Sequence, residues 1–397
     1  MVNSFNSRPG ILWRQVWGLA TLVAAISCSW MAYSLYQPKI LQKLEFVELA
    51  SYLGIFQGLL ATFIEPLVGA ISDRIQHHLG NRLLIVTVGV TLAGLIFVAI
   101  SLLLEQNLQG GIRWVIPVLM TLWVIAMISF RGPAIALLMQ FAPITELPQA
   151  NAVLVFVFGL IGAIGPLLNI FLNKIGATTT FLVSAIALLM GAYILRSSTP
   201  NRTFNSAILN QDIPATTPLL LLILVFIVGL GAGLEINLLM SIFPRTLQTQ
   251  LPSIKLEFIT SGILLVAAIA SVPLGEWTAQ IGANKAITLG LGAITGLMGL
   301  TLLNDNDILV VGFILAFGIS FSLVFVSMIP FALGKVTPHQ AGLGTGLYFA
   351  GAAGATALVS LLIKEIGITP IAAFLLAEVA FFVIAGCIFV SKKIQLA

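Results

Sequence analysis

The sequence predicts an all-α membrane protein in which twelve transmembrane helices form two pseudo-symmetric six-helix bundles. The first observation is composition: 59% of the 397 residues are hydrophobic and only 8% are charged, whereas soluble domains carry about 25% charged residues. The mean hydropathy is +1.10. The second observation is that the apolar residues come in long runs without the period-two alternation of a membrane barrel. Since backbone groups in lipid must be satisfied within their own segment, these runs are predicted to be helices of about 20 residues.

The first predicted span, residues 14–36, follows Arg8 and Arg14. It lacks a small-residue cleavage pattern, so it is predicted to be a retained helix and not a signal peptide. Five more apolar segments complete the first half of the chain, and six make up the second half. The predicted spans are 14–36, 46–72, 82–104, 113–139, 150–172, 178–196, 217–243, 255–279, 285–303, 307–333, 341–363 and 370–391.

A polar stretch separates the two sets of six spans. Residues 197–216 are rich in Ser, Thr, Asn and Pro, a composition that is typical of a linker. We therefore expect an N-terminal bundle over residues 1–196 and a C-terminal bundle over residues 217–397, joined by a cytoplasmic linker.

The two halves repeat short signals at corresponding places. The segment that leads from the second span into the next loop begins P-L-V-G at Pro66, and the segment that leads out of the eighth span begins P-L-G at Pro273. The pair Gln-Ala opens both the fifth and the eleventh span, at residues 149 and 340. These echoes indicate a duplicated six-span unit, and two such units with a site between them at mid-membrane are a transporter plan.

The distribution of Lys and Arg predicts the orientation. If the N-terminus is cytoplasmic, ten of the 18 basic residues fall on the inner side, seven fall outside, and Arg131 lies within a span. Cytoplasmic loops carry the excess of Lys and Arg, so both termini are predicted to lie in the cytoplasm and the protein in the cell membrane. The net charge of +4 then reflects basic inner loops, and no nucleic-acid partner is expected.

One loop carries a family signature. Gly69-x-x-x-Asp73-Arg74, followed by Gly80-Asn81-Arg82, resembles the second-to-third-loop motif of the major facilitator superfamily. The resemblance implies that Gly69 lets two helices approach closely. It implies that Asp73 pairs with Arg74, Arg82 or the positive end of a neighbouring helix. In that family this network holds one state of a gate.

A narrower resemblance covers about the first 150 residues. Ser29-Trp30, residues 35–38, the fourth-span segment 131–138 and Gln149-Ala150-Asn151 are similar to the glycoside–pentoside–hexuronide and sucrose–proton symporters. This resemblance implies a sugar or glycoside as solute. In that branch an acidic residue follows the fourth-span motif, where this chain has Gln140.

Charged residues inside spans are candidate functional residues. A charge at the bilayer centre costs about 2.5–3.5 kcal/mol, so Glu65, Arg131, Glu235 and Glu378 are expected to face protein or water. Glu65 and Arg131 both fall in the cytoplasmic half of the first bundle, where they can pair across the second and fourth spans. The pair is either structural, fixing helix packing, or a proton site in which Arg131 tunes Glu65.

Glu235 and Asn237 lie in the glycine-rich seventh span, and Glu235 is either a cavity-lining proton carrier or a structural group. Glu378 lies in the twelfth span, which the resemblance to the superfamily implies is peripheral, and it is expected to be structural or partly exposed to the lipid headgroups. Sugars are held by hydrogen bonds and aromatic faces, so polar and aromatic residues in the spans are candidate solute ligands, each weighed against ordinary packing. They are Trp30, Tyr33, Gln37, Gln57, Asn169 and Tyr348.

These observations predict a secondary active transporter that moves a small solute, a sugar or glycoside, by proton-coupled alternating access. Two alternatives stay open: proton-coupled efflux of an amphipathic compound, and a non-transporting assembly or sensing factor in the membrane. The sequence contains no nucleotide-binding loop, zinc spacing or nucleophile elbow, so no enzyme activity, cofactor or metal is expected. The expected partners are the solute, protons and the lipid bilayer, and the expected state is a monomer.

Overall fold

The computed structural model describes residues 10–80, 82–106, 109–199, 216–303 and 307–396, and the regular structure in these ranges is helical. Most of the predicted linker, residues 200–215, lies outside the described residues. The first-half elements are α1 (Trp13–Lys43), α2 (Val47–Leu79), α3 (Leu83–Leu104), η1 (Gly110–Trp114), α4 (Val115–Ala136), α5 (Leu138–Phe141), η2 (Ile144–Glu146), α6 (Leu147–Ala163) and α7 (Gly165–Ser198).

The second half repeats this plan. Its elements are α9 (Leu219–Gln250), α10 (Leu256–Ile281), α11 (Ala283–Leu302), α12 (Asp307–Gly334), η3 (Pro338–Gln340), α13 (Ala341–Leu361), the π-helical turn η4 (Leu362–Ile366) and α14 (Pro370–Leu396). Within the described ranges, twelve helical segments are long and apolar enough to cross a bilayer, which confirms the predicted fold class.

The fifth and sixth spans differ from their predicted form. The sequence predicts one unbroken span over residues 150–172, but α6 ends at Ala163 and α7 begins just before Pro166. Proline has no backbone N–H and crowds the carbonyl four residues earlier, so it breaks a helix at this point. The turn between the fifth and sixth spans falls inside α7, at Gly176, where φ is 81° and a residue without Cβ is favoured.

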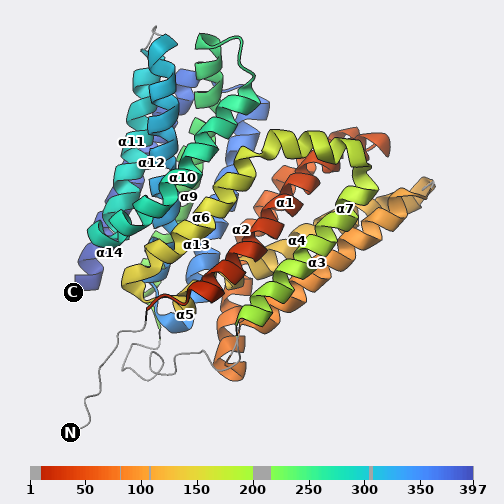
Figure 1. Cartoon of the computed structure of the whole chain (residues 1–397), viewed down its shortest axis with the longest axis horizontal. Helices are drawn as coiled ribbons and strands as arrows, with labels where there is room; N and C mark the ends of the chain where they lie inside the picture. Colours follow the sequence, from red (N-terminus) through yellow and green to blue (C-terminus); the bar gives the residue numbers. More distant parts are fainter. Residues whose placement is uncertain (1–9, 81, 107–108, 200–215, 304–306, 397) are drawn as a thin grey trace.

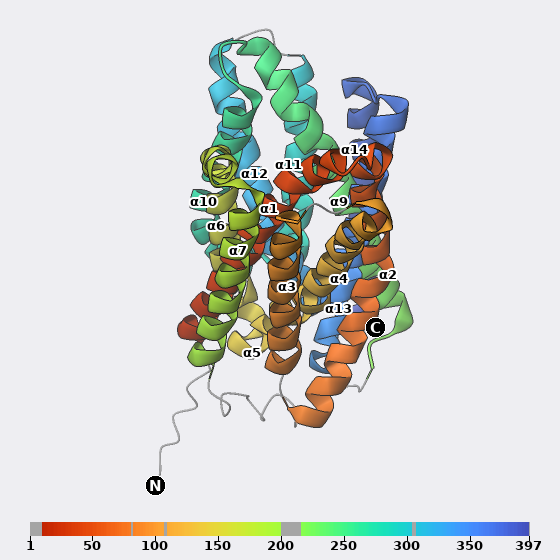
Figure 2. The ribbon, with the colours of Figure 1, turned by 90° about the vertical axis from the view of Figure 1, so that its right-hand side faces the viewer.

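The helices form two groups that follow the two halves of the sequence (Figure 1). Helices α1–α7 pack among themselves, as do α9–α14, and the groups meet chiefly where α2 lies along α13 and α6 along α10. We call the end at which α1 begins and α14 ends the gate end. The two groups converge there and diverge toward the opposite end (Figure 1), and Figure 2 shows the same helices from the side.

Candidate functional site: a gate and a central cavity

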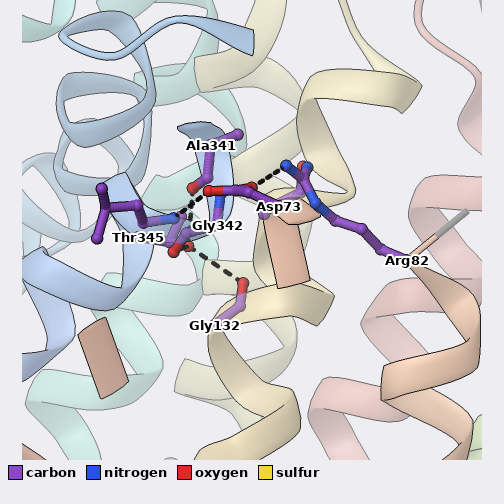
Figure 3. A network of polar contacts seen from close by, with 8 residues as sticks. Asp73, Arg82, Gly132, Ala341, Gly342 and Thr345 are labelled. Carbon is purple, nitrogen blue, oxygen red and sulfur yellow. Dashed lines mark hydrogen bonds and ion pairs between the residues drawn. The ribbon is translucent and has the colours of Figure 1, made fainter. Parts of the chain in front are cut away.

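The gate end is closed by a carboxylate that reaches from one half to the other. Asp73, near the end of α2, accepts hydrogen bonds from the backbone N–H groups of Gly342 and Leu343, both at 2.8 Å (Figure 3). These N–H groups open α13, and the first N–H groups of a helix have no partner within it. The Asp73 carboxylate therefore satisfies two donors of the other half and lies at the positive end of the α13 helix dipole.

The same carboxylate forms an ion pair within its own half. Arg82, directly before α3, pairs with Asp73 and also donates to the Ala136 carbonyl at 3.4 Å. The Arg82 side chain is 1% exposed, and this burial lowers the pKa of its guanidinium while Asp73 opposes the shift. Of the predicted partners of Asp73, the structure thus shows Arg82 and a helix end, whereas Arg74 lies on the exposed face of α2.

The glycines of the loop signature have different roles. Gly80 ends α2 in the left-handed region, with φ of 68°, and its N–H donates to Gln76 at 2.8 Å. Gly69 lies against the backbone of Gly342, and a Cβ at Gly69 would overlap the Gly342 carbonyl. Gly69 is therefore required for the close contact between α2 and α13 that brings Asp73 to the helix end.

A central cavity of about 660 Å³ lies between the two halves. Its walls come from α1, α4 and α6 on one side and from α12 and α13 on the other. The lining is mainly aliphatic and aromatic, including Phe158, Phe325 and Phe349, and the one charged side chain among its described lining residues is Arg131. Ser27, Ser34 and Asn151 supply further polar atoms. An apolar cavity with a few polar groups is the usual form of a small-molecule site.

Arg131 connects this cavity to the buried acid predicted as its partner. The guanidinium pairs with Glu65 of α2 and lies over the Phe349 ring at 4.7 Å. The Glu65 side chain is only 1% exposed, while that of Arg131 is 30% exposed because it faces the cavity. Within the described part of the chain, the second carboxylate oxygen of Glu65 has no hydrogen-bond partner. The carboxylate thus depends on Arg131 for its stabilisation in a site with almost no exposure to water.

An aromatic cluster stands behind the cavity wall. Trp30 lines the cavity and packs edge-on against Tyr33 and Trp123, with ring centroids 5.9 and 5.1 Å apart. Tyr33 and Gln57 are buried, and the Tyr33 hydroxyl and Gln57 amide are hydrogen-bonded at 2.8–2.9 Å. Of the aromatic and amide residues predicted as solute ligands, only Trp30 lines the cavity, and Tyr33 and Gln57 support it from behind.

Other predicted solute ligands lie outside the cavity lining. Gln37 is buried in α1. Asn169 lies in α7, where its backbone carbonyl accepts a hydrogen bond from the Asn173 side chain. Asn237 donates to Gly233 at 2.7 Å and to Thr356 at 3.2 Å, and Tyr348 is buried where α13 meets α9. Hydrophobicity and residue type placed them in spans, but the face of each helix that meets the cavity depends on packing between spans.

Glu235 is also outside the cavity lining, in the interior of the second half. It is fully buried, and its carboxyl lies 2.8 Å from the Thr295 hydroxyl of α11. The same hydroxyl lies 3.1 Å from the Leu291 carbonyl, yet it has one hydrogen to donate. A hydroxyl that donates to the carboxyl suits either protonation state of Glu235, whereas a hydroxyl that donates to Leu291 can only accept from a protonated carboxyl. The geometry is therefore compatible with both predicted roles of Glu235, a structural group and a proton carrier.

Sequence reasoning did not assign roles to several residues that join the halves. The Thr345 hydroxyl of α13 donates toward the Gly132 carbonyl of α4 at 3.2 Å (Figure 3), and Asn151 of α6 donates to backbone carbonyls of α12. Phe349 covers Arg131. For the Asn151 contact the sequence contains one signal, Pro330, which leaves a carbonyl of α12 without its helical N–H donor. The sequence does not say which side chain supplies the donor instead.

Comparison with solved structures shows the same fold. The human organic anion transporter MFSD10 (TETRAN) superposes with a TM-score of 0.68 at 16% identity, covering 94% of this chain and 99% of that one. The proton:xylose symporter XylE, bound to 6-bromo-6-deoxy-D-glucose, superposes with a TM-score of 0.63 at 11% identity, covering 97% and 95%. Comparison with curated proteins gave no match.

The family model described as Major Facilitator Superfamily matches residues 112–360, more than half of the chain. This match agrees with the twelve spans, the two groups of helices and the loop signature of α2. The chain belongs to the Major Facilitator Superfamily and is a multi-pass membrane protein that acts as a secondary transporter, not as an enzyme.

Proposed function

We propose that this transporter moves a small amphipathic organic anion together with a proton through the central cavity. The observation that carries the proposal is the placement of Arg131, which reaches a cavity lined otherwise by apolar and a few neutral polar side chains. Such a lining suits a solute with an apolar body and one anionic group, since a guanidinium binds carboxylates in a bidentate manner. The likeness in fold to a human organic anion transporter is consistent with this solute class.

Proton coupling follows from competition for Arg131. In the described structure the guanidinium is paired with Glu65. A solute carboxylate that binds Arg131 would draw it away from Glu65, leaving a buried carboxylate without a counter-charge. Burying an unpaired ion is costly, so Glu65 takes up a proton. The anion and the proton then travel together, and the net charge of the site is the same before and after binding.

The proposal also assigns sides of the membrane. The excess of Lys and Arg favours the cytoplasm for the gate end, and we propose the cell membrane as the location of the protein. The described state, closed at the gate end, is then outward-facing, and transport requires the α2–α13 and α6–α10 seams to open at that end. We propose a monomer as the working unit.

A sugar or glycoside is the second candidate solute. The resemblance of the first 150 residues to sugar–proton symporters favours it, and Trp30 offers an aromatic face in the cavity wall. The small number of hydrogen-bonding groups in the lining argues against it, since a sugar exposes several hydroxyl groups that each need a partner. Efflux of an amphipathic compound uses the same cavity and differs in the direction of net movement.

The test is uptake into proteoliposomes with an imposed pH gradient. We expect an acidic exterior to drive accumulation of a labelled aromatic carboxylate such as benzoate or a naphthoate, corrected for passive entry in protein-free vesicles, while a labelled glucoside does not accumulate. Arg131→Gln should abolish this uptake. Arg113→Gln is the matched control, because Arg113 pairs with Glu45 at 2.7 Å near η1, away from the cavity. Accumulation of the glucoside with no carboxylate uptake would overturn the proposal in favour of a sugar.

Glu65→Gln separates the coupling from the binding. The substituted amide is neutral in all states, so exchange of labelled for unlabelled carboxylate should persist while the pH gradient no longer drives accumulation. Proton-driven accumulation at the wild-type level in Glu65→Gln would exclude Glu65 as the proton carrier.

A further inference from the structure

The seam between α6 and α12 contains a contact between the two halves to which the proposed function assigns no role. Asn151 of α6 is 2% exposed. Its amide nitrogen donates to two backbone carbonyls of α12, those of Phe325 at 2.9 Å and Val326 at 3.0 Å. An amide NH₂ group carries two hydrogens, so each carbonyl receives one.

One of these carbonyls needs a donor from outside its helix. In an α-helix the carbonyl of residue 326 accepts from the N–H of residue 330. Residue 330 is proline, which has no N–H and whose ring crowds that carbonyl. Val326 is fully buried, and an unsatisfied buried carbonyl is costly. Asn151 supplies the missing donor, and it does so from the opposite half of the molecule.

A second contact between the halves, from α13 to α4, differs because its donor has other acceptors nearby. Thr345 of α13 donates toward the Gly132 carbonyl at 3.2 Å, but the Ala341 and Gly342 carbonyls lie within 3.0 Å of the same hydroxyl. One hydrogen serves three acceptors, two of them in its own helix. Loss of the inter-half contact therefore leaves Thr345 satisfied. The Val326 carbonyl has no such substitute in its own helix, because residue 330 offers no N–H.

Asn151 also belongs to the lining of the central cavity. The side chain thus borders the cavity while its nitrogen holds the seam, one turn from the gate-end start of α6.

We propose that Asn151 is a positioning residue for the transport cycle: it holds the α6–α12 seam closed at the gate end by capping the carbonyl that Pro330 frees. When the gate opens, water replaces the amide at this carbonyl. The contact therefore stabilises the closed state relative to the open one, and its removal shifts the equilibrium between them.

Pulsed electron spin resonance distances measure this equilibrium without requiring a solute. Spin labels are placed at Ser197→Cys in α7 and Gln280→Cys in α10, both exposed at the gate end, after Cys28 and Cys387 are replaced by Ser. We expect Asn151→Ala to increase the ratio of open to closed molecules about tenfold, because the orphaned carbonyl raises the energy of the closed state alone. Asn169→Ala, in α7 and outside the seam, should leave the ratio unchanged.

Pro330→Ala provides the decisive background. Alanine restores the N–H at residue 330, so the Val326 carbonyl gains a partner within α12. Asn151→Ala should then change the ratio less than about twofold. An equal shift in both backgrounds would mean that Asn151 acts through packing. No shift in the native background would mean that Asn151 does not hold the α6–α12 seam closed. Either result overturns the proposal.

Asn151→Leu offers a test that does not depend on Pro330→Ala folding. The leucine side chain has nearly the shape of asparagine and no hydrogen-bond donor, so it should open the gate at least as much as Asn151→Ala. A closed population equal to that of the native protein in Asn151→Leu would contradict the assigned role.

Discussion

The contact of Asp73 with the start of α13 provides the sharpest energetic prediction. Asp73→Asn keeps one acceptor oxygen and replaces the other with an NH₂ group that opposes a backbone N–H. One of the two bonds at 2.8 Å is lost, worth about 1.5–3 kcal/mol when the acceptor is charged. The favourable charge at the helix N-terminus is lost as well, about 0.3–1 kcal/mol. The sum of about 2–4 kcal/mol corresponds to a factor of about 30 to 1000 toward the open gate.

The ion pair with Arg82 makes a separable contribution. Asp73 and Arg82 lie in the same half, so their pair persists whether the gate is open or closed, and breaking it lowers the stability of both states. Arg82→Gln should therefore lower the melting temperature in detergent, as expected for loss of a buried pair, with a smaller effect on the gate than Asp73→Asn.

The assay is the distance between labels at residues 197 and 280, measured for both variants beside their melting temperatures. A closed population that is unchanged in Asp73→Asn, together with a lowered melting temperature, would refute the reasoning. Asp73 would then serve only to join α2 to α3.

Three further predictions concern buried groups. Glu235→Gln should keep both stability and proton-driven uptake, because a glutamine amide can donate to Thr295 as a protonated carboxyl does; loss of coupling in this variant would instead make Glu235 a proton carrier. A Cβ at Gly346 would lie 3.1 Å from the Glu65 carbonyl carbon, so Gly346→Ala should open the gate in the spin-label assay, whereas Gly386→Ala, with open space around it, should not. Burial lowers the pKa of Lys335 to about 8 from its ordinary value of 10.5, so the folded state binds fewer protons than the unfolded one between these values, and stability should rise with pH across that window. Lys335→Met should flatten this rise in melting temperature; an equally steep rise in the variant would assign it to other groups.

The fold was predictable from the sequence because the bilayer restricts the available structures. Long apolar runs in lipid form helices, so the twelve spans followed from composition and run length. The break between α6 and α7 was not predicted, since Pro166 lies within an uninterrupted apolar run and its effect on the helix is local.

The gate was more predictable than the cavity. The loop signature spaced Gly69, Asp73 and Arg82 along one helix and the start of the next, so their proximity was largely local. The sequence could also place Glu65 and Arg131 in the same half of the first bundle. It could not say which face of a helix meets the cavity, because that depends on the rotation of each helix against its neighbours. Asn169 and Tyr348 were predicted on residue type and lie elsewhere for this reason.

The position of Trp30 gives the protein an optical reporter of its own cavity. Four of the six tryptophans, at positions 13, 17, 114 and 277, are exposed on the outer surface of the molecule, and Trp123 is fully buried. Trp30 lines the central cavity. A bound solute should quench part of the intrinsic fluorescence, and Trp30→Phe should abolish this quenching. The change in fluorescence would therefore report occupancy of the cavity in the unlabelled protein.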